Sequence, residues 1–393
     1  MADITQRSAV VPHVPLRAVG MALLVIAALL AVVAMVVGSR QTRLPPPFGL
    51  AQNGLVAYAA DGDILIYDPA TGTTRPLVSG PEIDHEPMFS YDGSRIGWTR
   101  TTTTSGSPAQ VIVVADADGS DMVVVTPNTI GTDAAFEWAP DSRALIVASG
   151  GDLWIYGAER SAGPPQLLAE DAVAYHKPFR PPLGEQVMIT RMIDDRVQLL
   201  LRDVRSHDET VVVEGDPGVG IGTARWSPDG TQILYGMRPE SDPDSERLFI
   251  VNADGTGARQ ITRAPGTWYD IDPTWSPDGT RIAFTRYERV APDDWQVRPT
   301  GIYSIADGSL TEVGPLPRDV RAQHPSSNDG FATPGEGFFL EWAPDGQILF
   351  ALHSEAAGHP VMINPADGSW RVLDPVAEAG DPLHAWQRTA LDP

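Results

Sequence analysis

The chain has 393 residues, which suits two or three average domains or one large all-β domain, and its 42% hydrophobic residues can fill a large core. It carries 28 Lys and Arg against 51 Asp and Glu, a net charge of −23. This charge excludes nucleic acid as the main partner, because phosphate backbones repel such a surface. The absence of cysteine excludes disulfides, thiolate metal sites and cysteine nucleophiles.

The first element in chain order is an uncharged apolar run from Val19 to Gly38. A helix of this length spans roughly 30 Å, the hydrocarbon thickness of a bilayer. We therefore predict a cytoplasmic tail over residues 1–17 and an uncleaved transmembrane helix over 18–39, with a cleaved signal peptide as the alternative. The flanking arginine counts are tied, so charge does not fix the orientation. We expect the rest of the chain to be exported, because an uncleaved N-terminal anchor commonly exports the domain on its C-terminal side.

A proline-rich linker over residues 40–53 leads into a repeated motif. An aromatic anchor followed by a turn sequence recurs as Trp138-Ala-Pro-Asp-Ser, Trp226-Ser-Pro-Asp-Gly, Trp275-Ser-Pro-Asp-Gly and Trp342-Ala-Pro-Asp-Gly, with weaker copies at Phe89 and Phe179. Pro, Asp and Gly in this order favour a tight turn, and short apolar alternations follow each anchor. We expect the anchors to pack in the core between repeats.

Four short strands per unit and a period near fifty residues predict an all-β fold, a β-propeller over residues 54–393. The first unit supplies only three strands, Leu55–Tyr58, Ile64–Tyr67 and Arg75–Val78. Its missing inner strand is predicted at His384–Gln387, so that pairing of the N- and C-terminal strands closes the ring. This arrangement gives seven blades, or six if the unit around Phe179 is not a blade.

The W-S-P-D-G-x-x-I-x-F pattern, followed by the segment from Asn252 to Thr262, resembles the TolB-type propeller repeat, also called the WD40-like or PD40 repeat. The resemblance covers roughly residues 54–393. It implies a propeller, commonly exported, that binds other proteins and has no catalysis of its own. TolB proteins have an additional N-terminal domain, whereas here we expect a membrane helix and a linker before the propeller.

Strand alternation places the Pro-Asp-Gly and Ala-Asp-Gly turns on one face of the disc and the longer connections on the other. The predicted insertions are residues 101–108, 238–246, 287–299, 315–337 and 353–359. Loops carried by a rigid scaffold commonly bind partners. We therefore expect a protein or peptide partner, or an envelope component, at this insertion-rich face.

Carboxylates and imidazoles recur near the start of the inner strands, at the mouth of the central channel. Asp84, Asp133, Asp270 and Asp381 each lie five residues before an anchor, with His85, Glu86, His176, Asp272 and His384 nearby. Such a ring could hold a divalent cation or a basic ligand. The alternative is that these residues cap strand ends and bind backbone amides.

The sequence contains no nucleophile elbow, zincin motif or phosphate-binding glycine loop, so we expect a non-catalytic protein without a cofactor. Some proteins with this repeat are metal-dependent lyases. The resemblance therefore leaves a lyase as the alternative, with His85, His176, Asp270 and His384 around a divalent cation. A sensor that signals through the cytoplasmic tail is a third reading.

Overall fold

The computed structural model describes residues 45–104, 107–126, 135–160, 162–174, 177–238, 246–262, 268–291, 294–314, 321–322, 338–347, 349–353, 361–372 and 381–391. The chain divides into two units, 1–43 and 44–393. The predicted tail and membrane helix fall in the first unit, outside these residues. Within the described part, no helix is long and apolar enough to cross a membrane.

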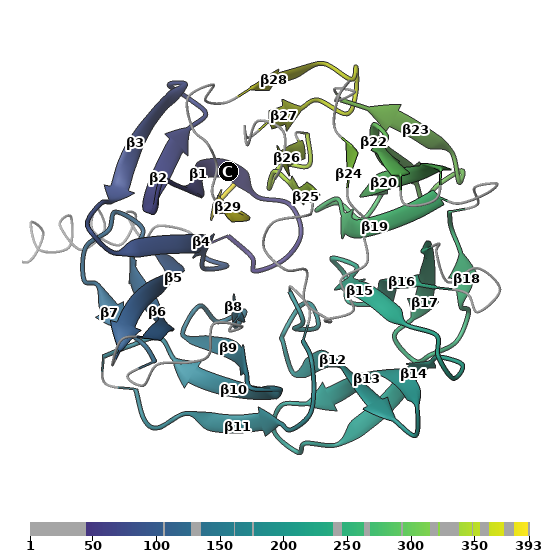
Figure 1. Ribbon diagram of the computed structural model, residues 1–393, viewed down its shortest axis with the longest axis horizontal. Helices are drawn as coiled ribbons and strands as arrows, with labels where there is room; N and C mark the ends of the chain where they lie inside the picture. The colour runs from purple at the N-terminus through teal and green to yellow at the C-terminus, as the bar shows by residue number, and fades with distance from the viewer. Residues whose placement is uncertain are drawn as a thin grey trace, which may run out of the picture. The chain divides into compact units, whose positions relative to one another are not determined.

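The strands of the second unit form separate antiparallel sheets arranged around a central axis (Figure 1). The first sheet joins the two ends of the unit in the order β29 (Asp381–Thr389), β1 (Gln52–Ala60), β2 (Asp63–Asp68) and β3 (Thr73–Val78). Val56 pairs with Trp386 and Ala57 pairs with Ala385. The predicted closure of the ring by its terminal strands is thereby confirmed.

The other sheets follow in chain order around the ring. The first two are β4 (Ile83–Phe89), β5 (Arg95–Thr104), β6 (Ser107–Asp116), β7 (Val123–Val124), and then β8 (Ala135–Trp138), β9 (Ala144–Ser149), β10 (Asp152–Gly157), β11 (Gln166–Ala169). The next two are β12 (Gln186–Ile193), β13 (Arg196–Asp203), β14 (Glu209–Glu214), and then β15 (Ile221–Trp226), β16 (Gln232–Met237), β17 (Arg247–Asn252), β18 (Arg259–Gln260). The last two are β19 (Trp268–Trp275), β20 (Arg281–Ala291), β21 (Asp294–Val297), β22 (Thr300–Ser304), β23 (Leu310–Val313), β24 (Arg321–Ala322), and then β25 (Phe338–Trp342), β26 (Leu349–His353), β27 (Val361–Ile363), β28 (Trp370–Val372).

The predicted all-β propeller is confirmed, and six of its sheets have at least four strands. The remaining sheet, β12-β13-β14, has three. The anchor Phe179 precedes this sheet and joins it through an isolated bridge to Val187. The weak copy of the sequence motif therefore coincides with the sheet that has the fewest strands.

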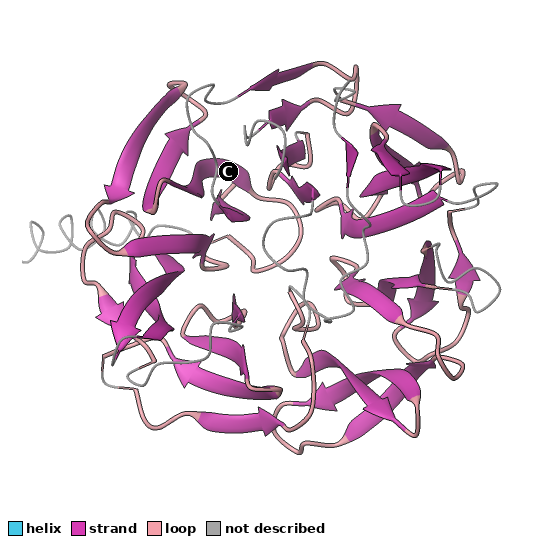
Figure 2. Ribbon diagram, viewed as in Figure 1, coloured by secondary structure: helices cyan, strands magenta, loops and turns pink. Residues whose placement is uncertain are grey.

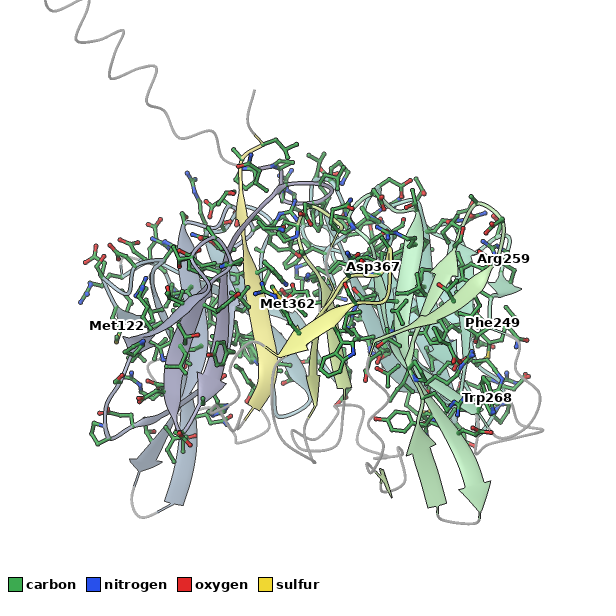
Figure 3. All side chains as sticks on the ribbon, turned by 90° about the horizontal axis from the view of Figure 1, so that it is seen from above. Met122, Phe249, Arg259, Trp268, Met362 and Asp367 are labelled. Carbon is green, nitrogen blue, oxygen red and sulfur yellow. The ribbon has the colours of Figure 1, made fainter. Side chains whose placement is uncertain are left out.

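The two faces of the disc differ as strand alternation predicts. The short anchor turns lie on one face, called the turn face here, and the connections between second and third strands lie on the opposite insertion face. Two long hairpins, β5–β6 and β20–β21, project from the insertion face (Figure 3).

Several ranges predicted as insertion loops are strands in part (Figure 2). Residues 101–104 and 107–108 extend the β5–β6 hairpin, and residues 287–291 and 294–297 form the β20–β21 hairpin. Arg321–Ala322 from the next predicted insertion pairs with β21. Residues 239–245, 354–359 and most of 315–337 lie outside the described residues.

The anchor side chains lie in the core between neighbouring sheets, as predicted. All six predicted anchors are buried, and so is Trp386 of β29, which serves as the anchor of the first sheet: Phe89, Trp138, Phe179, Trp226, Trp275, Trp342 and Trp386. Burial of such large apolar side chains is the main stabilising contribution in a ring of otherwise separate sheets. The same packing fixes the inner strands around the axis, where a functional site could lie.

Candidate functional site: the axial channel

The inner strands β4 and β19 each contain one more residue than their partner strands between matched pairs. In β4 the register shifts between His85 and Met88, and in β19 it shifts between Ile271 and Thr274. The extra residues Glu86 and Asp272 take left-handed conformations, with φ of 56° and 49°. A bulge of this kind reverses which side of the strand a residue faces. The residues on the N-terminal side of each bulge therefore face the opposite side of the strand from the residue just before the anchor.

Asp84 and Asp270 lie on the N-terminal side of these bulges and are buried within their own sheets. The Nε of Arg100 donates to Oδ1 of Asp84 at 2.6 Å, and its second amino group donates to Oδ2 at 2.8 Å. Arg286 binds Asp270 in the same two-fold manner, at 2.6 and 3.0 Å. Each pair joins residues that face one another across adjacent strands. Both carboxylates are thus used in structural ion pairs.

The remaining predicted mouth residues divide between two sheets and the undescribed part of the chain. His85 lies within hydrogen-bond distance of Thr101 Oγ1, at 3.2 Å, and Glu86 accepts from Thr99 Oγ1 at 3.1 Å. Asp133 and His176 lie outside the described residues, as do the side chains of Asp381 and His384. Among the residues that are described, no three His, Asp or Glu side chains come close enough to hold a metal ion.

The turn-face end of the channel contains a cavity of ≈ 200 Å³ that sequence reasoning did not identify. Residues immediately before the anchors contribute polar groups to its wall: Glu137, Arg225, Thr274 and Glu341. Alternation along a strand directs such a residue toward the axis when its neighbour, the anchor, points between the sheets. The position immediately before each anchor is therefore the sequence signal from which the cavity wall could have been predicted.

Lys177, the only lysine in the chain, lines this cavity. Its Nζ lies 3.2 Å from Oε1 of Glu341, and its backbone amide donates to Oε2 of Glu137 at 2.9 Å. Burial raises the pKa of Glu341 above its ordinary value, and the charge of Lys177 opposes this rise. The contacts link three sheets across the axis and give the cavity a mixed charge.

Hydrogen bonds from three tryptophan anchors join neighbouring sheets around the channel, whereas two further tryptophan anchors make no such bond. The indole nitrogen of Trp138 donates to the carbonyl of Met88 at 2.9 Å, and Trp226 and Trp342 make the equivalent bonds to Pro178 and Thr274. In each case the acceptor is the residue before the preceding anchor. Trp275 and Trp386 are also buried and line the cavity, but their indole nitrogens have no hydrogen-bond partner among the described atoms.

Two further polar atoms at the cavity, Tyr91 Oη and Arg388 Nε, also have no partner among the described atoms. Tyr91 is only 7% exposed, and burial followed by the charge of Glu137 raises its pKa well above the ordinary value. Burial lowers the pKa of Arg388 to about 10. No ion pair of Arg388 is present in the described part of the chain, and the charges of Tyr91 and Glu341 only partly oppose the effect of burial on its pKa.

The segment Pro45–Leu50, called the strap here, crosses the turn-face end of the channel ahead of β1 (Figure 1, purple). Arg388 donates to the carbonyls of Pro46 and Gly49 at 3.1 and 2.7 Å. The ring of Phe48 packs against Tyr91 with centroids 4.9 Å apart. The strap therefore forms one wall of the cavity.

A buried carboxylate, Glu246, lies at the end of the 238–246 insertion. It is 3% exposed, and its Oε2 lies 3.4 Å from the Nε of Arg238. Burial raises the pKa of Glu246 to about 7, and the charge of nearby Asp272 adds to this rise while Arg238 opposes it. Tyr269, whose pKa is also raised by burial, completes the group. Sequence reasoning missed this cluster, because no motif marks it.

No protein-family model matches the chain. A stretch of 183 residues is 26% identical to a TolB homolog of Chlorobium luteolum and covers 46% of this chain and 38% of that protein. A shorter stretch of 67 residues is 39% identical to dipeptidyl-peptidase 5 of Porphyromonas endodontalis and covers 16% of this chain and 9% of that protein. The chain thus matches less than half the length of either curated relative.

Among solved structures, an oligogalacturonate lyase in complex with manganese is similar with a TM-score of 0.54. The two chains are 14% identical, and the match covers 82% of this chain and 85% of the lyase. At this identity the likeness concerns the propeller fold alone.

Proposed function

We propose that this TolB-like β-propeller is a non-catalytic, membrane-tethered protein that binds a protein or peptide at its insertion face. The observation that carries the proposal is the asymmetry of the disc. The turn face has short anchor turns, whereas the insertion face projects the β5–β6 and β20–β21 hairpins. Elaboration of one face of a rigid scaffold is typical of a binding surface.

Exposed apolar side chains on the insertion face support a protein partner. Met192 near the tip of the β12–β13 hairpin is 62% exposed, and Ile83 at the start of β4 is 57% exposed. Large apolar side chains near projecting hairpins are suitable anchors for an interface. The net charge of −23 favours a partner with a basic surface.

The absence of an enzyme activity is part of the proposal. Asp84 and Asp270, two of the carboxylates considered for a metal, are held by arginines of their own sheets. A metal would have to displace these paired guanidinium groups. The tether and the location outside the cytoplasm rest on the apolar run from Val19 to Gly38.

We infer that the three-stranded sheet acts as a seventh blade. Phe179 bridges to Val187, and the carbonyl of Pro178 accepts from both Met188 N and the Trp226 indole. The last bond is the one that inner strands accept elsewhere in the ring.

The binding proposal can be tested with the full chain and a shortened β5–β6 hairpin. Residues 102–109 would be replaced by Asn-Gly, which joins the paired residues Thr101 and Gln110 through a tight turn. Cross-linking in the membrane fraction of the source cells, followed by purification, should recover a partner with the wild-type chain and lose it with the shortened one.

The matched control removes exposed apolar groups from the turn face. Trp370 and Leu183 are 50% and 73% exposed there, and their replacement by Ser should leave recovery unchanged. Loss of partner recovery with this control, but not with the shortened hairpin, would place the partner on the turn face and refute the proposal.

A separate titration with Mn²⁺, Ca²⁺ and Zn²⁺ tests the lyase alternative. A rise in Tm that His85→Ala abolishes would show that a metal binds at this residue and would favour the lyase alternative.

A further inference from the structure

The axial cavity combines several buried polar groups that lack protein partners. Tyr91 Oη, Trp386 Nε1, Trp275 Nε1 and Arg388 Nε all belong to residues that line it, and none has a hydrogen-bond partner among the described atoms. An indole nitrogen and a guanidinium nitrogen can only donate, and a phenol can donate as well. The residues around the cavity therefore include donors without acceptors, and these atoms have almost no exposed surface, so a ligand reaches them only when neighbouring side chains shift.

A comparison within the ring shows that this arrangement is not a general property of the anchors. Trp138, Trp226 and Trp342 donate to carbonyls of the preceding sheet at 2.9–3.3 Å. The same bond would join Trp275 to the residue before Trp226, and Trp386 to the residue before Trp342, but neither forms. A buried donor without an acceptor destabilises the folded protein, so a ligand that accepts these bonds would recover that cost.

The charge at this end of the cavity specifies the kind of acceptor. Arg388 forms no ion pair in the described part of the chain, and Glu341 in the cavity wall neutralises its charge only in part, which is unfavourable for a buried cation. Glu137 and Glu341 stand in the same wall, and they would repel a ligand that carries two negative charges. A single carboxylate satisfies Arg388 at the lowest cost, whereas a phosphate dianion does not.

The rest of the wall specifies the body of the ligand. Phe48, Met88 and the anchor rings are apolar, and the volume of ≈ 200 Å³ admits a small organic molecule rather than a folded chain. We propose that the axial cavity binds a small organic carboxylate with an apolar body, whose oxygens accept from Arg388, Tyr91 and Trp386 beneath the strap. This site lies at the turn-face end of the channel and is independent of the partner proposed for the insertion face.

The test measures binding of phenylacetate to the full chain by isothermal titration calorimetry. Phenylacetamide has the same shape without the charge, and it should bind at least tenfold more weakly. Tyr91→Phe removes one donor and keeps the ring, so it should weaken phenylacetate binding by about tenfold. A tripeptide that ends in phenylalanine carries the same carboxylate, and tighter binding of this peptide would assign the site to a peptide C-terminus.

Tyr67 supplies the matched control. It is also buried and its Oη also lacks a partner among the described atoms, but it does not line the cavity. Tyr67→Phe should leave binding unchanged. Arg388→Gln should abolish binding, although it also removes the hydrogen bonds to the strap, and for this reason Tyr91→Phe is the deciding variant. Equal affinities for the acid and the amide, full affinity of Tyr91→Phe, or no binding of either probe would each overturn the proposal.

Discussion

The two ends of the axial channel differ in how their buried charged side chains are paired. Toward the insertion face, Asp84 and Asp270 each place both oxygens on an arginine of the same sheet. At the turn face, Arg388 and the Tyr91 hydroxyl stand at a cavity without such partners. The first end uses buried charge to hold strands together, and the second leaves buried polar groups for a ligand.

This difference shows that the residues that recur in every repeat need not be the residues that bind a ligand. Two of the carboxylates that recur in the sequence, Asp84 and Asp270, form ion pairs within their own sheets, because copies of a scaffold share the same internal contacts. The cavity lies where the copies differ, at a tyrosine in the turn after Phe89 and at two anchors that do not donate.

The largest expected effect comes from breaking the Asp270–Arg286 pair. The two side chains are 0% and 3% exposed, so Asp270→Ala leaves a buried guanidinium whose remaining carboxylate partner, Glu312, lies 4.0 Å away. We expect a loss of about 3–5 kcal/mol in the free energy of unfolding, measured by urea denaturation. Replacing both residues together, as Asp270→Leu with Arg286→Met, should recover part of the loss.

The Asp84–Arg100 pair has the same geometry with more access to water, because Arg100 is 17% exposed. Asp84→Ala should therefore cost less, about 1–2 kcal/mol. Equal losses at the two sites would show that burial does not decide the strength of these pairs.

A change of pH should have an effect on stability comparable with the loss of the Asp270–Arg286 pair. The folded-state pKa of Glu246 is raised to about 7 from 4.5, so between these values the folded state holds a proton that the unfolded state has released. The contribution of Glu246 to stability therefore falls as pH rises through this window, by about 3 kcal/mol in all, and stays low above it.

Glu246→Gln isolates this contribution from the other carboxylates. The free energy of unfolding of this variant, minus that of the wild type, should rise between pH 4.5 and pH 7. Arg238, Asp272 and Tyr269 face Glu246 and are unchanged in both proteins. Parallel pH profiles would mean that Glu246 is ionised without penalty in the folded protein.

The sequence predicted the ring, its closure and the packing of the anchors, because apolar alternation, turn chemistry and a fixed period are local signals. It did not predict the role of Asp84 or Asp270. The bulges at Glu86 and Asp272 reverse the alternation, and a bulge leaves no clear mark in one sequence. The cavity was missed because it depends on hydrogen bonds between residues far apart in the chain, such as Arg388 and the strap.

The smallest predicted effect compares two anchors that differ mainly in one hydrogen bond. Trp138 and Trp386 are 0% and 4% exposed, so a change to Phe removes similar apolar contacts at both. Trp138→Phe also leaves the carbonyl of Met88 without its donor, whereas Trp386→Phe breaks no such bond. Trp138→Phe should thus destabilise the protein by about 1 kcal/mol more in urea denaturation. Saturating phenylacetate should narrow this gap, because the ligand would give Trp386 an acceptor that its Phe variant cannot use. A gap that is absent without the ligand would mean that Trp386 donates as the other anchors do.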